Sequence, residues 1–172
     1  MPSRRLVLRV AGLEVMVTEV RMLEQAFTGL ERVLVHGCGL ARPGWLDEAE
    51  AAWAGVRATG RPGAPSYRSA GGRGRCLGRD TFAGDVLARL GVHQLYREHA
   101  ERYPRIPIDE LTAQGAELVV LPDEPYRFAA DDGPEAFPGL PAALVSGRHL
   151  TWYGPSLAEA PAVLTAALSA AR

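Results

Sequence analysis

Two short stretches of the sequence carry side chains that could recognise a ligand. The first is Pro122-Asp123-Glu124-Pro125-Tyr126-Arg127-Phe128, and the second is Leu150-Thr151-Trp152-Tyr153-Gly154-Pro155. Each follows a predicted strand, and open α/β sheets present ligand sites at the carboxyl ends of their strands. Aromatic faces with a few directed polar groups suit a large, flat or macrocyclic ligand. The same residues also fit ordinary loop anchors that pack on a sheet, and composition alone leaves both interpretations open.

Other reactive side chains form no recognisable constellation. His93 and His99 could share one side of a short helix with Glu98 and Glu101 nearby, but a metal site needs a tighter set such as HExxH. We therefore expect them on the solvated surface. The sequence contains no GxSxG or Walker A motif, and no GxGxxG after an apolar strand. We predict no catalytic residue, no resident cofactor or metal, and no enzymatic activity.

The two cysteines, Cys38 and Cys76, lie far apart and in no CxxC spacing. This pattern predicts neither a zinc site nor a disulfide framework.

Hydrophobic periodicity locates the elements that must position these residues. The alternation of strands and helices favours an α/β lobe with a parallel sheet. Pro161 lies early in the last helix and is expected to kink or delay it. Residues 147–155 are expected to form a loop. Strands are predicted at 13–18, 117–122 and 143–146, and helices at 21–35, 45–56, 80–91, 109–114 and from 156 onward.

Residues 57–79 differ from the rest because glycine alternates with arginine and almost nothing is apolar. Such a segment cannot offset its ordering entropy by burial, so residues 59–77 are predicted to be irregular. An RGG-type segment that binds single-stranded RNA is an alternative. A single aromatic, Tyr67, argues against it, and we expect no nucleic-acid partner.

Composition indicates one ordinary domain. The chain has 172 residues, 47% hydrophobic and 23% charged, with 19 Lys+Arg against 20 Asp+Glu. The net charge of -1 excludes a generally basic nucleic-acid binder. No apolar run approaches the roughly 20 residues that span a bilayer. The opening residues 1–9 lack an apolar signal-peptide core, so we expect no export signal in this chain.

Four motifs stand together in an order and spacing that make them more specific than any one alone. They are Gly78-Arg79-Asp80-Thr81-Phe82-Ala83-Gly84-Asp85-Val86-Leu87; Arg102-Tyr103-Pro104-Arg105-Ile106; Leu118-Val119-Val120-Leu121-Pro122-Asp123-Glu124-Pro125-Tyr126-Arg127-Phe128; and Gly147-Arg148-His149-Leu150-Thr151-Trp152-Tyr153-Gly154-Pro155.

Together these motifs resemble the carboxyl-terminal lobe of class III, helical-backbone metal-chelate binding proteins, with cobalamin importers as the closest branch. The resemblance implies an α/β fold: a three-layer lobe with a mainly parallel sheet flanked by helices, plus a long inter-lobe helix. It divides the chain into an amino-terminal lobe remnant (1–42), the inter-lobe helix (43–58), the irregular Gly/Arg segment (59–77) and the ligand-binding lobe (78–172).

The resemblance also implies a function. The chain would be the substrate-binding component of an ABC importer for cobalamin or a related metal chelate, such as haem or a ferric siderophore. Its loaded form would dock on the importer permease. The ligand-binding loops of the family map onto Glu124, Tyr126, Arg127, Trp152 and Tyr153, of which Trp152 is the expected ring-stacking contact.

Departures from the family pattern suggest a truncated receptor. Much of the amino-terminal lobe has no counterpart, and residues 57–79 stand where the family has an apolar strand, which suggests a frameshifted or degenerated strand. An alternative is a non-transporting cytoplasmic remnant or adaptor that keeps the lobe and forms a homodimer through its exposed surface. The resemblance implies a periplasmic or cell-envelope location, whereas a complete chain without an export signal stays in the cytoplasm.

Overall fold

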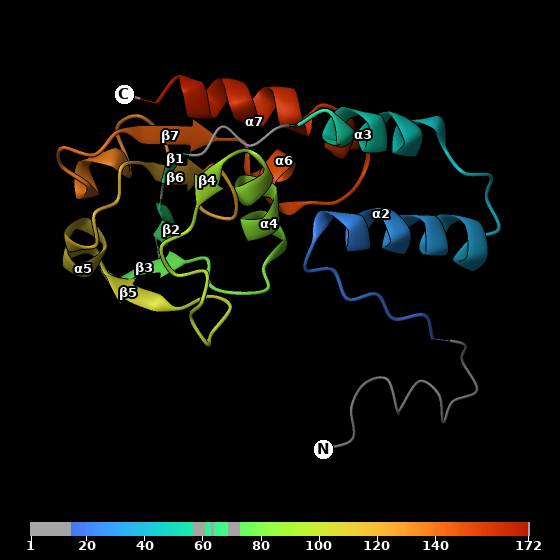
Figure 1. Ribbon diagram of the computed structural model, residues 1–172, viewed down its shortest axis with the longest axis horizontal. Helices are drawn as coiled ribbons and strands as arrows, with labels where there is room; N and C mark the ends of the chain where they lie inside the picture. The colour runs from blue at the N-terminus through green and yellow to red at the C-terminus, as the bar shows by residue number, and fades with distance from the viewer. Residues whose placement is uncertain (1–14, 57–60, 63, 69–72, 172) are drawn as a thin grey trace, which may run out of the picture.

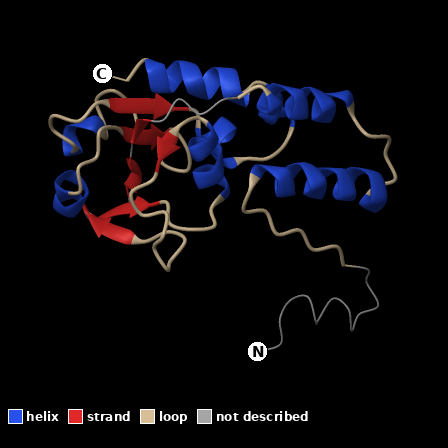
Figure 2. Cartoon of the chain, viewed as in Figure 1, coloured by secondary structure: helices blue, strands red, loops and turns tan. Residues whose placement is uncertain are grey.

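A five-stranded sheet forms the centre of the structure, a computed structural model that describes residues 15–56, 61–62, 64–68 and 73–171. Helices lie around the strands (Figures 1 and 2). The strand order is β5-β3-β2-β6-β7. β2, β6 and β7 run parallel, while β3 runs antiparallel to both β2 and β5. The strands are β2 (Ala64–Arg68), β3 (Arg73–Cys76), β5 (Arg105–Pro107), β6 (Val119–Pro122) and β7 (Ala142–Val145), with a separate parallel pair of β1 (Arg61–Pro62) and β4 (Val92–His93).

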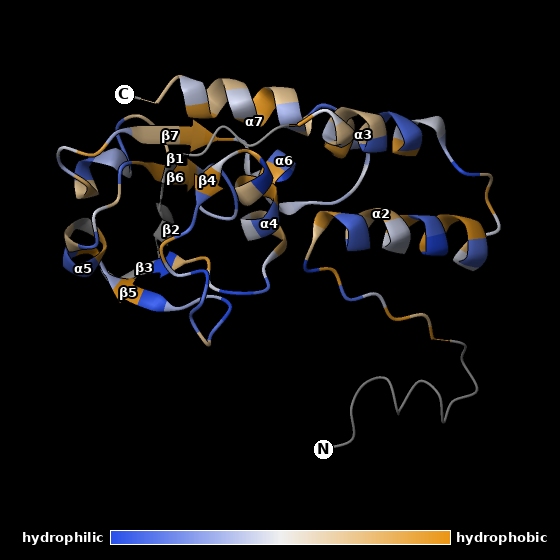
Figure 3. Cartoon of the chain, in the orientation of Figure 1, coloured by the Kyte–Doolittle hydropathy of each residue, from blue (hydrophilic) through white to orange (hydrophobic). Residues whose placement is uncertain are grey.

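Strand β6 is buried on both faces, which gives the lobe its layers. All four of its residues are buried, and successive side chains of a strand point to opposite faces. Val120 packs in a cluster with the helices, whereas Val119 and Leu121 pack in a second cluster with Phe128 and Phe137. Figure 3 shows β6 as hydrophobic, while β3 and β5 carry hydrophilic residues. The predicted α/β class and the layered arrangement are confirmed.

The predicted helices are present with shifted ends. In Figure 1, α2 and α3 lie at the side of the molecule opposite α5. Among the described helices, none is long and apolar enough to cross a bilayer. The helical elements are α2 (Leu23–Glu31), the π-helix η1 (Arg32–Gly37), α3 (Gly44–Ala54), α4 (Phe82–Arg89), α5 (Ile108–Ala113), the 3-10 turn η2 (Pro134–Ala136), α6 (Gly147–Thr151), the 3-10 turn η3 (Pro155–Ala158) and α7 (Ala160–Ser169).

The carboxyl-terminal helix shows the predicted effect of Pro161. A 3-10 turn precedes α7, and Pro161 occupies its first turn. The missing N–H of proline costs little there, because the first-turn amides of a helix have no partner within the helix.

Helix α3 buries Leu46, Ala49 and Trp53, and Trp53 also hydrogen-bonds the carboxyl-terminal part of the chain. Trp53 is only 4% exposed, and its indole Nε1 donates a hydrogen bond to the carbonyl of Leu157 in η3 at 3.0 Å. The predicted span 43–58 corresponds to α3 at Gly44–Ala54. That this helix joins two lobes, and that the domain boundaries fall as expected, stay predictions.

The Gly/Arg segment is not irregular as predicted. Within 59–77 the structure contains β1, β2 and β3, and β2 lies between β3 and β6 in the sheet. Backbone hydrogen bonds with neighbouring strands need no particular side chain, so tertiary pairing overrides an unfavourable composition. Residues 57–60, 63 and 69–72 lie outside the described residues.

Two other local predictions are wrong. Residues 15–18 of the expected strand 13–18 form no strand, since within the described chain they join neither sheet; residues 13 and 14 lie outside the described residues. Residues 147–151 of the expected loop form the short helix α6. The amide of Gly147, the first residue of α6, donates to Asp123 in the loop after β6, and periodicity alone does not reveal this long-range contact.

Candidate functional site

The two candidate loops are held together at the ends of β6 and β7. The amide of Asp123, just after β6, donates to the carbonyl of Val145 at 3.0 Å. The carboxylate of Asp123 in turn accepts the amide of Gly147 at 2.6 Å, where α6 begins. Because the strands are parallel neighbours, their carboxyl ends meet at one edge of the sheet. The fold therefore brings both loops to one place.

Gly147 allows the loops to approach closely. A Cβ at this position would lie 2.7 Å from the Cβ of Glu124 and 2.8 Å from its backbone nitrogen. Contacts between backbone and Cβ atoms at such distances do not occur without a shift of the chain. Only glycine therefore fits between α6 and the first loop, whose Glu124–Pro125 peptide bond is cis.

Trp152 joins the two loops through its indole. The Nε1 of Trp152 donates to the Oε2 of Glu124 at 2.9 Å, yet the residue remains 64% exposed. The hydrogen bond restrains the ring while its faces stay open to solvent. An exposed but oriented indole is well suited to stack on a flat ligand, because little rotational freedom remains to be lost.

The two tyrosines of the loops rest on phenylalanines. Tyr153 contacts Phe82 edge to face, with ring centroids 5.6 Å apart at 69°. Tyr126 contacts the buried Phe128 in the same way, at 4.8 Å and 61°. The hydroxyl of Tyr126 also hydrogen-bonds the carboxylate of Asp132. Both tyrosine rings remain more than 40% exposed, so each is oriented but open on one side.

These side chains line a cavity of about 1110 Å³. Four of the five predicted site residues lie along it, and the structure brings these four together. Arg127 is exposed and does not line the cavity. The lining residues are Arg75, Leu77, Phe82, Ala83, Tyr103, Glu124, Pro125, Tyr126, Thr151, Trp152 and Tyr153.

Sequence reasoning missed Arg75 and Tyr103 as cavity residues. Tyr103 lies in the motif that begins Arg102-Tyr103-Pro104, so membership of this motif is a sequence signal that could have identified it as a cavity residue. Arg75 belongs to the Gly/Arg segment, and its composition pointed away from an ordered strand. In the structure it is the next-to-last residue of β3.

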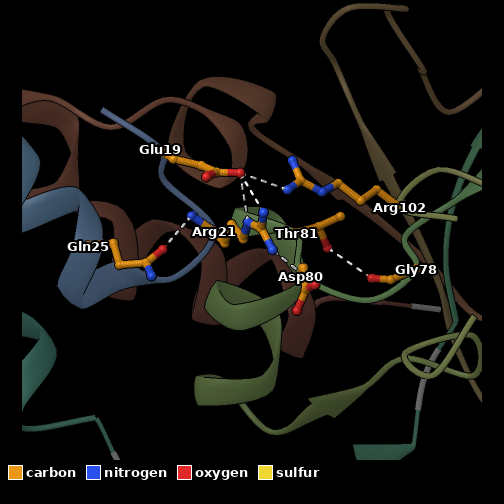
Figure 4. A network of polar contacts seen from close by, with 7 residues as sticks. All are labelled: Glu19, Arg21, Gln25, Gly78, Asp80, Thr81 and Arg102. Carbon is orange, nitrogen blue, oxygen red and sulfur yellow. Dashed lines mark hydrogen bonds and ion pairs between the residues drawn. The ribbon is translucent and has the colours of Figure 1, made fainter. Parts of the chain in front are cut away.

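Arg102, which precedes Tyr103 in the sequence, belongs to a group of contacts that we call the junction network: Glu19, Arg21, Asp80 and Arg102 (Figure 4). Glu19 accepts hydrogen bonds from Arg21 at 2.5 Å and from Arg102 at 3.1 Å. Arg21 also reaches Asp80 at 3.2 Å. These contacts attach the segment before α2 to the residue that precedes Tyr103.

Gly78 fixes the same segment through the backbone. Its amide donates to the carbonyl of Arg102 at 2.8 Å, and a Cβ on Gly78 would lie 2.0 Å from the carbonyl oxygen of Glu101. The backbone around Tyr103 is therefore held from two sides.

The thiols take no part in the cavity. Cys76 is buried and Cys38 exposed, and both are free. Burial raises the pKa of Cys76 to about 12, so it stays a neutral thiol at physiological pH. Within the described chain, no three His, Cys, Asp or Glu side chains gather as a metal site would require. The cavity itself offers aromatic faces, one carboxylate and one guanidinium, a lining that suits binding of a large flat molecule.

Comparison with known proteins identifies the fold. No family model matches this sequence, and no curated protein matches it. Among solved structures, the periplasmic vitamin B12 binding protein BtuF of Vibrio cholerae aligns with a TM-score of 0.67 and 12% identity, over 98% of this chain and 70% of its own. The periplasmic heme-binding protein RhuT from Roseiflexus sp. RS-1 aligns with a TM-score of 0.72 and 17% identity, over 97% of this chain and 71% of its own.

A third structure extends the range of ligands. It is described as an ABC-type Fe3+-hydroxamate transport system from Saccharomonospora viridis, and it aligns with a TM-score of 0.64 and 15% identity, over 95% of this chain and 64% of its own. Identities this low establish a likeness of fold. The resemblance to class III binding proteins that the four motifs predict is confirmed at that level.

Proposed function

We propose that this chain is a solute-binding component of an ABC importer whose ligand is a metal chelate: cobalamin, a haem or a ferric siderophore. The fold supports the proposal, because similar solved structures are described as binding vitamin B12 or heme, or as part of an Fe3+-hydroxamate transport system. The chain would act in the periplasm or cell envelope and deliver its ligand to a permease. It would make and break no covalent bond.

One observation carries the proposal: Trp152 is oriented by Glu124 but leaves its ring faces exposed in an aromatic cavity. Several exposed aromatic side chains gathered in one cavity are typical of a ligand-binding groove. Stacked on a macrocycle or chelate, the Trp152 indole buries apolar area from a restrained starting position.

The remaining predicted residues would complete the site. Tyr126 and Tyr153 present ring edges and faces from the two loops, and Glu124 orients the indole. Arg127, on the exposed part of the first loop, would contact polar substituents that project beyond the cavity.

The test is a titration of the purified chain with three probes: cyanocobalamin, iron protoporphyrin and a ferric hydroxamate siderophore. Ligand absorbance is the readout, since it does not depend on tryptophan. Saturable binding of one probe is expected, and Trp152→Ala should weaken it about tenfold or more. The matched control is Trp45→Ala, because Trp45 lies on α3 and does not line the cavity.

Two results would contradict the proposal. One is the absence of binding by all three probes up to roughly 100 μM, which corresponds to a binding free energy weaker than about −5.5 kcal/mol. The other is an equal loss in the Trp152 and Trp45 variants, which would show a general effect on the fold.

A further inference from the structure

Arg75, which lines the cavity, lies directly opposite a second arginine that does not line it. Arg75 of β3 pairs in register with Arg105 of β5, and the two strands are antiparallel. Directly opposite residues of such a pair project from the same face, with Cβ atoms roughly 4.5–5.5 Å apart. Both residues are exposed. Like charges in this position repel, so the arrangement costs free energy unless an anion lies between them.

No acid of the chain relieves this repulsion within the described residues. Neither Arg75 nor Arg105 forms an ion pair or a side-chain hydrogen bond there. Several other arginines form ion pairs: Arg21, Arg42, Arg89, Arg97 and Arg102. Arg32, Arg79, Arg127 and Arg148 form none within the described residues, so what distinguishes Arg75 and Arg105 is their pairing in register next to the cavity.

A general role of surface charge does not account for the pair. Charged side chains on an edge strand prevent edge-to-edge aggregation, and β5 is such a strand, so this role could explain Arg105. It does not explain Arg75, because β3 lies inside the sheet between β5 and β2. Arg75 also lines the cavity together with Tyr103 and Trp152.

The acid that does line the cavity is directed elsewhere. Glu124 hydrogen-bonds the indole of Trp152, and it makes no ion pair with Arg75. The N–H donors of the Arg75 guanidinium are therefore available to a ligand. A guanidinium presents these donors as a planar fork that matches the two oxygens of a carboxylate.

We propose that Arg75 and Arg105 form an anion subsite that binds a carboxylate of the ligand, so that the site selects acidic, carboxylate-bearing planar chelates over neutral, amide-substituted ones. This inference rests on the proposed function and narrows its ligand class. Aromatic side chains hold the flat part of the ligand, and the arginine pair holds its acidic edge. The bound carboxylate removes the repulsion between the two guanidinium groups.

The experiment compares two probes that share one macrocycle and differ only at its two carboxyl groups: iron protoporphyrin, which carries two carboxylates, and its uncharged dimethyl ester. Both are titrated by absorbance in the same detergent-containing buffer. The unmodified chain should bind the free acid about tenfold or more tightly than the ester. Arg75→Gln and Arg105→Gln should remove most of this preference by weakening acid binding while leaving ester binding unchanged. Raised salt should also weaken binding of the acid more than binding of the ester.

Arg32→Gln is the matched control, because Arg32 is an exposed arginine of η1 that does not line the cavity. It should leave the preference intact. Should Arg75→Gln fail to fold, Arg75→Lys keeps the charge without the fork and is expected to retain part of the preference.

The outcomes separate the two proposals. Equal affinity for acid and ester in the unmodified chain, or an equal loss for both probes in Arg75→Gln, overturns the anion subsite while the proposed function stands. Tighter binding of cyanocobalamin than of the free acid also overturns it. Absence of binding by either porphyrin, by cyanocobalamin and by the ferric siderophore defeats the proposed function itself.

Discussion

The junction network and the cavity use the same residue type in opposite ways. At the junction, Arg21 and Arg102 converge on Glu19, and Arg21 also reaches Asp80, so the charges compensate one another within the chain (Figure 4). At the cavity, the lining residue Arg75 faces Arg105 of the neighbouring strand, and neither contacts an acid of the described residues.

We propose that this difference separates residues that stabilise the fold from residues that contact a ligand. Two arginines directly opposite each other in register repel, which costs free energy unless an anion lies between them. The exposed aromatics of the cavity show the same pattern, since Trp152 and Tyr153 are oriented from one side and left open on the other. Changes at the cavity should therefore affect ligand binding, and changes at the junction should affect the docking of α2.

The largest expected effect is that of Gly147→Ala at the cavity. The new methyl group would meet Glu124 at 2.7 Å and force the two loops apart. Overpacking against backbone costs about 2–3 kcal/mol of unfolding free energy, which urea denaturation would measure. Ligand binding should fall with it, because the Trp152–Glu124 contact cannot form across the displaced loops.

Gly154→Ala is the control for this prediction. Gly154 belongs to the same second loop, a Cβ there meets nothing within 4 Å, and its φ of 175° is accessible to any residue. Its stability should match that of the unmodified chain. Equal stabilities of the Gly147 and Gly154 variants would show that the loops do not approach as closely as the structure has them.

Next to the junction network, Asp85→Ala should weaken the attachment of α2 to α4. The carboxylate of Asp85 accepts the amide of Leu23, the first residue of α2, at 2.9 Å and the Nε of Arg89 at 2.9 Å. Leu23 is buried, so its amide would lose its acceptor. The expected cost is about 1 kcal/mol, comparable to the loss of a helix cap. Faster hydrogen exchange should be confined to α2, with ligand binding unchanged.

Asp47→Ala provides the comparison for Asp85. Asp47 is also a first-turn acid, but it lies in α3, is exposed and pairs with Arg42 at the surface. Surface substitutions of this kind stay within about 0.5 kcal/mol. A weakening of ligand binding by Asp85→Ala would contradict the separation between junction and cavity.

A smaller effect is expected from Glu124, whose carboxylate orients Trp152. Glu124→Ala should leave stability within about 0.5 kcal/mol, because both side chains are exposed. The indole N–H resonance of Trp152 should move upfield as its acceptor is lost. Glu124→Gln keeps an acceptor oxygen and should show an intermediate shift. An unchanged indole resonance in Glu124→Ala would mean that the hydrogen bond does not restrain the ring.

The sequence predicts the helices well, because apolar spacing identifies α2 and α4. It also predicts that the loops after β6 and β7 lie at one edge of the sheet. The choice of Glu124, Tyr126, Trp152 and Tyr153 as ligand contacts follows from the family resemblance and stays a prediction. Parallel strands bring their carboxyl ends together whatever the loops contain.

The strands of the Gly/Arg segment could not be predicted in this way. β2 and β3 owe their conformation to backbone hydrogen bonds with β6 and β5, which lie about 30 to 55 residues away in the sequence. Arg75 was missed for the same reason, since its place beside the cavity depends on that pairing. Arg105 lies in the motif Arg102-Tyr103-Pro104-Arg105-Ile106. Only the register of β3 and β5 shows that Arg105 faces Arg75.

The smallest effect expected is a shift in the titration of Glu19 at the junction. Hydrogen bonds from Arg21 and then Arg102 hold the pKa of Glu19 below its ordinary value of 4.5. A carboxylate whose pKa is lowered by folding stabilises the native state above its unfolded pKa, and this contribution is lost as the pH falls through the folded pKa. Carbon-detected NMR of the Glu19 carboxyl should show a midpoint below 4.5. The midpoint should rise in Arg21→Gln more than in Arg102→Gln, because Arg21 makes the stronger contact, and added salt should narrow these differences. A midpoint that is the same in all three proteins would mean that Arg21 and Arg102 do not interact with the Glu19 carboxylate. The contrast between paired arginines at the junction and unpaired arginines at the cavity would then fail.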